Sequence, residues 1–245
     1  MLSLNSNPEH MKTFTYALLF FLLLFTACTA PHEKVSVDYT TYVNPFIGTD
    51  FTGNTYPGAQ APFGMVQLSP DNGLPGWDRI SGYFYPDSTI AGFSHTHLSG
   101  TGAGDLYDIS FMPVTLPYKE AEVPLGIHSR FSHDDESATA GYYQVLLKDY
   151  NINVELTATE RCGIQRYTFP EAQAAIFLNL KKAMNWDFTN DSRIEIVDSV
   201  TIQGYRFSDG WARDQHIYFR TRFSKPFTSV QIDTTAIIKD GKHIG

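Results

Sequence analysis

The sequence predicts an all-β protein built as an antiparallel β-sandwich, and three observations support this. Several short runs alternate apolar with polar residues, a period that places the apolar side chains on one face of a strand. Gly, Pro, Asn and Asp separate these runs, and no stretch sustains a helical period beyond about three turns. Aromatic residues make up 14% of the 245 residues, which is typical of strands. We therefore expect many short strands with one face of each sheet in the core.

The expected strands follow one another between residues 65 and 223. The clearest alternation places Ile152, Val154 and Leu156 on one face, and a second places Ile217, Phe219, Thr221 and Phe223 together. The other expected strands are Met65–Leu68, Ile109–Met112, Tyr143–Leu147, Ile164–Phe169, Ala175–Leu180, Ile194–Val197 and Val200–Phe207.

Residues 1–27 are predicted to be a lipoprotein signal peptide, with translation starting at Met11. A basic start precedes the apolar run Ala17–Phe25, which is too short for a permanent membrane helix of about 20 residues. Small residues then lead to Cys28, whose thiol would carry a lipid after cleavage. We expect export, with the protein anchored to the periplasmic or outer-surface face of a bacterial membrane. The alternative is an ordinary signal peptide with an incidental Cys28.

The rest of the chain divides into a polar tether, residues 28–38, and a domain, residues 39–245. Only Cys162 lies within this domain, so an intradomain disulfide is excluded. A hydrophobic content of 42% excludes a disordered chain. The formal net charge of −8 argues against a nucleic-acid partner, because binding to phosphate backbones relies on clustered positive charge.

The segment Asn44–Gly104 is rich in glycine and is predicted to form a set of shaped loops. Such loops are often plain surface turns, but they also let backbone groups approach a ligand closely. Within them Trp77 stands beside Asp78. The indole could plug the core, or it could form a platform on which the apolar face of a sugar stacks. Trp211, beside Gly210, has the same ambiguity.

Other polar residues suggest chemistry only weakly. His95 and His97 would share one face of a strand, so a metal site with Asp105 or Asp108 is possible, although two histidines held by hydroxyls and backbone are the commoner outcome. The acidic run 134–136 is expected to be a solvated loop. Neighbouring carboxylates rarely face each other across a sugar, so we assign no catalytic residue to this chain.

Several motifs together resemble the N-terminal domain of glycoside hydrolase family 92, the exo-acting, calcium-dependent α-mannosidases. The resemblance covers roughly residue 39 to the end, and Gln165 and Tyr107 are mild departures from the family pattern. The matching segments are Tyr42–Thr49 (YVNPFIGT), Ala61–Asp71 (APFGMVQLSPD), Ser81–Tyr83 (SGY), Gly92–Gly102 (GFSHTHLSGTG) and Val154–Arg161 (VELTATER).

This resemblance implies a galactose-mutarotase-like supersandwich, packed in the family on a C-terminal (α/α)₆ barrel with the active site between them. It also implies an inverting mechanism that uses a general-acid Glu, a base-type Asp and a calcium ion. Those groups belong mostly to the barrel, which is absent here, so we expect no bound calcium in this chain. The resemblance assigns Trp77, with Gly53 and Asn54, to the substrate pocket. We interpret the chain as an N-terminal fragment whose sandwich is incomplete at the C-terminus.

Three functions remain open at this point. The first is the substrate-shaping half of an exported α-mannosidase that acts on mannose-rich glycans, either N-glycans or mannan, and is catalytically incomplete alone. The second is a freestanding carbohydrate-binding envelope lipoprotein. The third is a metal-binding envelope protein built on His95 and His97.

Overall fold

The computed structural model describes residues 12, 13, 16, 36–100, 102–118, 126–181, 187–231, 237–239 and 242–244. The chain divides into two units, residues 1–38 and 39–245. Most of the first unit, including the predicted signal peptide and Cys28, lies outside the described residues. None of the described helices has the length and apolar character needed to cross a membrane.

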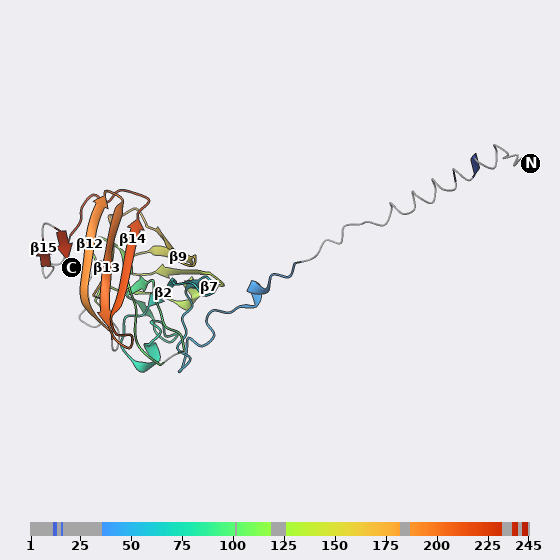
Figure 1. Cartoon of the computed structure of the whole chain (residues 1–245), viewed down its shortest axis with the longest axis horizontal. Helices are drawn as coiled ribbons and strands as arrows, with labels where there is room; N and C mark the ends of the chain where they lie inside the picture. Colours follow the sequence, from blue (N-terminus) through green and yellow to red (C-terminus); the bar gives the residue numbers. More distant parts are fainter. Residues whose placement is uncertain are drawn as a thin grey trace, which may run out of the picture. The chain divides into compact units, whose positions relative to one another are not determined.

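The second unit is a stack of antiparallel sheets (Figure 1). Its central sheet has the order β1-β2-β4-β5-β11. These strands are β1 (Ala59–Gln60), β2 (Gln67–Asp71), β4 (Gly92–Ser94), β5 (Ser110–Thr115) and β11 (Ala174–Asn179). In β5 every residue from Ser110 to Val114 is buried, because this sheet is covered on both faces.

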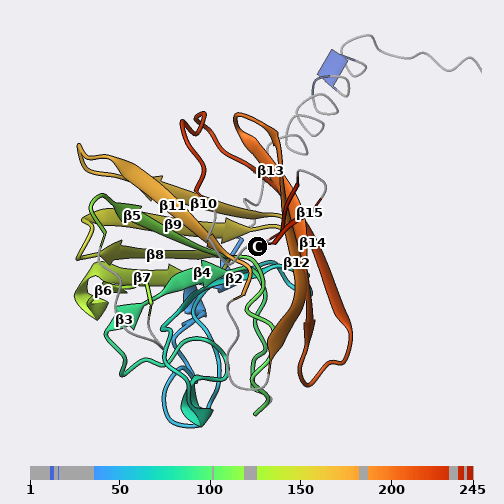
Figure 2. The same cartoon turned by 90° about the vertical axis from the view of Figure 1, so that its left-hand side faces the viewer.

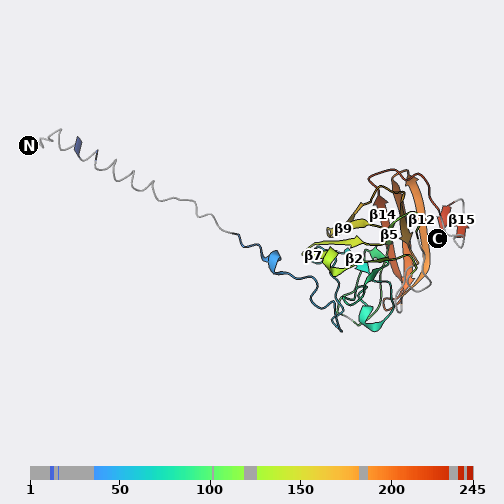
Figure 3. The same ribbon diagram turned by 180° about the vertical axis from the view of Figure 1, so that it is seen from behind.

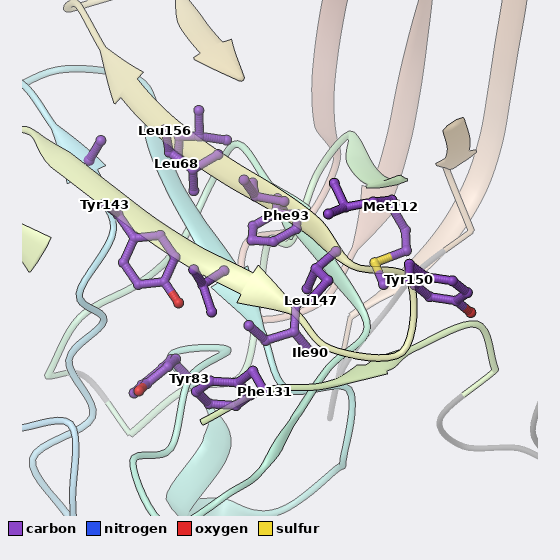
Figure 4. Packing of buried hydrophobic residues seen from close by; sticks show 14 of the residues in the cluster. Leu68, Tyr83, Ile90, Phe93, Met112, Phe131, Tyr143, Leu147, Tyr150 and Leu156 are labelled. Atoms are coloured by element: carbon purple, nitrogen blue, oxygen red, sulfur yellow. The ribbon is translucent and has the colours of Figure 1, made fainter. Parts of the chain in front are cut away.

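A four-stranded sheet with the order β10-β9-β8-β7 covers one face of the central sheet. Its strands are β7 (Glu136–Thr139), β8 (Tyr142–Leu147), β9 (Ile152–Ala158) and β10 (Gly163–Thr168). Buried and partly exposed residues alternate along β8 and β9, so Val145, Val154 and Leu156 face inward. Figure 4 shows how side chains of these strands meet Leu68, Phe93 and Met112 of the central sheet in the main core.

A three-stranded sheet, β12-β13-β14, covers the other face. Its strands are β12 (Phe188–Asp198), β13 (Thr201–Asp209) and β14 (Gln215–Arg222), and Figure 2 shows them running across the strands of the other two sheets. A second core forms here, where Phe111 of β5 meets Ile194, Ile217 and Phe219. Residues 111 and 112 therefore point into different cores, as alternation along a strand requires.

Shorter elements complete the described fold. Strands β3 (Thr89–Ile90) and β6 (Ser129–Arg130) pair with each other, as do β15 (Ile237–Lys239) and β16 (Lys242–Ile244). The β15–β16 hairpin lies next to β12 (Figure 3). Three short 3₁₀ helices, η1 (Tyr39–Tyr42), η2 (Trp77–Arg79) and η3 (His133–Asp135), lie in the connecting segments.

The prediction of an all-β antiparallel sandwich is confirmed, and every expected strand overlaps an observed one. The sequence analysis did not predict β1, β3, β4, β6, β7, β15 and β16, which have two to four residues each. Runs this short cannot display a period. They form because neighbouring strands provide hydrogen-bond partners.

The prediction of a solvated loop at residues 134–136 is wrong for Glu136, whose side chain is buried. The hydroxyls of Tyr143 and Tyr83 donate hydrogen bonds to its carboxylate at 2.6 and 2.9 Å, and His133 Nδ1 lies 2.7 Å away. Tyr83 is 53 residues distant in the chain. Local polarity cannot reveal such a partner, and a carboxylate with several donors tolerates burial that an isolated one does not.

Candidate functional site

Three glycine-rich loops of the segment 44–104 meet at one end of the sandwich. The amide of Gly100 donates to the carbonyl of Asn54 at 2.6 Å. The hydroxyl of Ser81 donates to the carbonyl of Thr55 at 3.0 Å, which joins the loop after η2 to the loop that contains Asn54. In both Figure 1 and Figure 2 the turn between β13 and β14 lies at this same end.

Trp77 lies on η2 at this end of the fold, and 56% of its surface is exposed. Its ring passes over Gly102, where any Cβ would come within 3.3 Å of the indole. Arg79, in the same short helix, is fixed by Asp87, with Nε 2.6 Å from Oδ2. One side of the indole therefore packs on the loop of Gly102, and the rest is exposed to solvent. Trp77 does not fill the core, as it would if it were a plug.

Exposed Gly53 and buried Asn54 hold the shape of their loop. A Cβ at residue 53 would come within 2.3 Å of the carbonyl oxygen of Gly48, so only glycine fits there. Asn54 is buried in a left-handed conformation with φ 51°, and its Nδ2 donates to the carbonyl of Thr52 at 3.3 Å. Because its backbone carbonyl accepts a hydrogen bond from the amide of Gly100, Asn54 fixes the loop in which Gly102 contacts Trp77.

Trp211 forms the tip of the β13–β14 turn and is 74% exposed. The turn is tied to buried Asp105, whose carboxylate accepts hydrogen bonds from the amide of Ala212 at 2.8 Å and from Gln215 Nε2 at 2.9 Å. Asp105 follows Gly102 by three residues, so one loop supports both exposed tryptophans. The Gly-Trp pair left open whether the indole is exposed, and no local pattern could connect this turn to a carboxylate more than 100 residues earlier.

The two histidines belong to separate internal networks. Buried His97 bonds the carbonyl of Gln67 through Nδ1 at 2.7 Å and Asp71 Oδ1 through Nε2 at 2.8 Å. His95 Nδ1 bonds the carbonyl of Ile109 at 2.8 Å, and burial lowers the pKa of its ring. Both rings are held by protein groups, as in the commoner outcome for such a pair.

A buried ionic cluster joins the third sheet to the loop of Asp105. Arg206, on β13, is fully buried, and its guanidinium bonds Asp108 at 2.5 Å and also Asp187. Its Nε lies 3.1 Å from the carbonyl of Leu180. Burial raises the pKa of Asp187 to about 6, against the opposing effect of Arg206, and the charges of Asp108 and Asp105 add to the rise. No motif in the sequence predicted this ionic cluster.

The raised pKa of Asp187 predicts a definite pH dependence of stability. Because the folded-state pKa of about 6 lies above the ordinary 3.8, the folded state holds this proton more tightly. Its contribution to the free energy of unfolding is therefore largest below pH 4 and declines as pH rises through 6. Relative to Asp187→Asn, the wild type should lose stability between pH 4 and pH 7. Urea unfolding of both proteins at each pH checks this, and a constant difference would contradict it.

The described residues contain no group of three or more His, Cys, Asp or Glu side chains placed to hold a metal ion. Asp105 and Asp108, the candidate partners of the histidines, instead bind Gln215 and Arg206. These carboxylates are therefore occupied by protein donors in the described part of the chain, an arrangement that does not fit calcium.

A sequence model described as the glycosyl hydrolase family 92 N-terminal domain matches residues 42–244. The family GH92 alpha-mannosidase BT3965 from Bacteroides thetaiotaomicron, solved in complex with mannoimidazole, superposes with a TM-score of 0.75. It is 42% identical, and the match covers 83% of this chain and 27% of that one. The GH92 family glycosyl hydrolase ccman5 gives a TM-score of 0.63 at 28% identity, covering 75% of this chain and 26% of that one.

A curated relative is described as an uncharacterized secreted glycosidase of Arthroderma benhamiae. It is 28% identical over 165 residues, which is 64% of this chain and 20% of the relative. The chain thus spans about a fifth to a quarter of the length of the relatives that it matches.

Proposed function

Because the chain belongs to glycosyl hydrolase family 92, whose N-terminal domain it carries, we propose that it is the substrate-shaping part of an exported α-mannosidase. The substrate is a terminal α-mannoside of a mannose-rich glycan. Trp77 is the observation that carries the proposal: a rigidly supported, exposed indole suits the apolar face of a sugar ring. The mannoimidazole complex of the 42% identical relative supports the same sugar class.

Exposed apolar side chains in the segment 47–65 support the idea that this chain works with a further domain. Ile47, Phe51, Phe63 and Met65 are all well exposed, and both phenylalanines are held outward on left-handed backbone. Large apolar side chains exposed to this extent suit contact with another protein surface. We assign it to the remaining part of a family 92 enzyme, which accounts for about three-quarters of the length of the solved relatives.

Replacing Trp77 tests the proposed sugar platform. In a chimera that joins this chain to the remainder of the 42% identical relative, Trp77→Ala should lower kcat/KM for an aryl α-mannoside about tenfold or more. Its melting temperature should barely change, because the indole is more than half exposed. Trp77→Phe keeps an aromatic face and should retain most of the activity. A large fall in melting temperature with normal kcat/KM would instead show that Trp77 serves the core.

Lipid anchoring at Cys28 is the second proposal about this chain, and the secreted description of a relative supports export. A serine hydroxyl cannot form the thioether that carries the lipid, so Cys28→Ser should shift the protein out of the membrane fraction or leave the precursor uncleaved. Cell fractionation with intact-mass measurement checks this. A serine variant with the normal mature mass that still partitions with membranes would identify an ordinary signal and another mode of attachment.

A further inference from the structure

The outward face of the third sheet carries a compact aromatic cluster that the loop site does not use. Tyr205 and Phe207 of β13 stack with their ring centroids 4.3 Å apart, and Phe207 stacks on His216 of β14 at 3.9 Å. Tyr218 is inclined to both β13 rings at 6.0 and 5.6 Å. It is 70% exposed, so most of its ring remains open to a ligand.

Polar side chains surround this cluster and already hydrogen-bond to one another. Tyr205 donates its hydroxyl hydrogen to Asp191 Oδ2 at 3.1 Å, Gln203 Nε2 donates to Glu195 at 3.3 Å, and Arg220 donates to Gln203 at 3.1 Å. The pairing is regular along β13 and β14, which keeps this part of the face even. Aromatic rings bordered by planar donors and acceptors on an even surface match a sugar, which has apolar C–H faces and a rim of hydroxyls.

The composition of the face favours a glycan over a protein. Aliphatic side chains of these strands, such as Ile194 and Ile217, point into the second core. The ten outward residues around the cluster include no Leu, Ile, Val or Met, and exposed Val197 lies farther along β12, beyond Glu195. The fully buried centre of a protein interface is more apolar than this. The outward residues are Asp191, Arg193, Glu195, Gln203, Tyr205, Phe207, His216, Tyr218, Arg220 and Arg222. With two carboxylates and three guanidinium groups the face is nearly neutral, which suits a neutral polymer.

The cluster is also continuous with the candidate site. Phe207 and His216 are paired residues next to the β13–β14 turn, and Trp211 is the exposed tip of that turn. The turn is fixed by Asp105, in the loop that supports Trp77. The cluster and the candidate site are therefore connected through the β13–β14 turn.

We propose that this face, centred on Tyr218, is a second glycan-binding surface that holds an α-mannan chain away from the bond to be cleaved. The inference rests on the proposed function for the choice of mannose. It predicts polymer binding by the full chain without any catalytic partner. One stacked ring contributes enough affinity that its removal should weaken binding about fivefold to tenfold.

Affinity electrophoresis of the full chain in gels that contain soluble α-mannan tests this surface. Tyr218→Ala and Phe207→Ala should each lower retardation about fivefold or more, while Tyr218→Phe should restore most of it. Tyr42→Ala removes a tyrosine that is 78% exposed elsewhere on the domain and should change nothing. Circular dichroism of each variant confirms folding, and Tyr218 is exposed enough that its variant should fold.

The outcomes separate this inference from the proposed function. If Trp77→Ala abolishes retardation and Tyr218→Ala leaves it intact, all binding occurs at the loops, and the second surface is rejected while the proposed function stands. An unretarded wild type also rejects it, because the kcat/KM of the chimera tests the proposed function separately. If Tyr218→Ala instead weakens association with the rest of a family 92 enzyme, the face is a domain interface and the inference is wrong.

Discussion

Replacing Arg206 by methionine should lower the free energy of unfolding by about 3–5 kcal/mol. Arg206 is completely buried and bonds the carboxylates of Asp108 and Asp187 together. Methionine fills a similar volume but leaves two buried carboxylates facing each other without a cation. Breaking one member of a buried ionic group in this way is costly because the remaining charges keep their desolvation penalty.

A triple variant separates this charge effect from lost packing. Adding Asp108→Asn and Asp187→Asn to Arg206→Met removes the uncompensated charges, so it should recover a large part of the lost stability. Urea unfolding followed by tryptophan fluorescence measures all the variants. A loss below about 1 kcal/mol for Arg206→Met would mean that water or a rearranged side chain compensates the carboxylates, contrary to their complete burial around Arg206.

The layered core was predictable from the sequence, since it depends on local alternation. The alternation of Ile152, Val154 and Leu156 with polar residues predicts a strand, because residues two apart in a strand share a face. The central strand β5, by contrast, is buried on both faces, so its sequence shows a continuous apolar run whose length and flanks alone mark it as a strand.

The supports of the candidate site were not predictable, because each one links residues that are distant in the chain. Asp105 reaches the β13–β14 turn across 107 residues, and Asp108 reaches Arg206 across 98. Nothing in the sequence indicates that Asp105, Asp108 and Arg206 are buried together. Trp77 could be selected from its Gly and Asp neighbours, yet whether it filled the core or faced solvent depended on Gly102, which lies in another loop.

The other large expected effect concerns catalysis. The 245-residue chain alone should release no mannose above the buffer rate from any α-mannoside, with or without calcium, whereas the chimera with the rest of the 42% identical relative should be active. Glycosidases accelerate hydrolysis by factors of about 10⁶ or more. That acceleration requires an acid and a base placed about 5–10 Å apart on either side of the scissile bond.

Four carboxylates near the loops are already engaged by protein groups in the described fold. Asp71 is buried against His97, Asp105 holds the Trp211 turn, and Asp108 and Asp187 hold Arg206. Asp78, beside Trp77, is partly exposed and would need a second carboxyl group across the sugar from it. Release of mannose by the chain alone, lost in Asp78→Asn, would therefore overturn the view that this domain shapes the substrate but does not cleave it. An inactive chimera that assembles correctly would reject the α-mannosidase assignment itself, because the only sequence exchanged would be this domain.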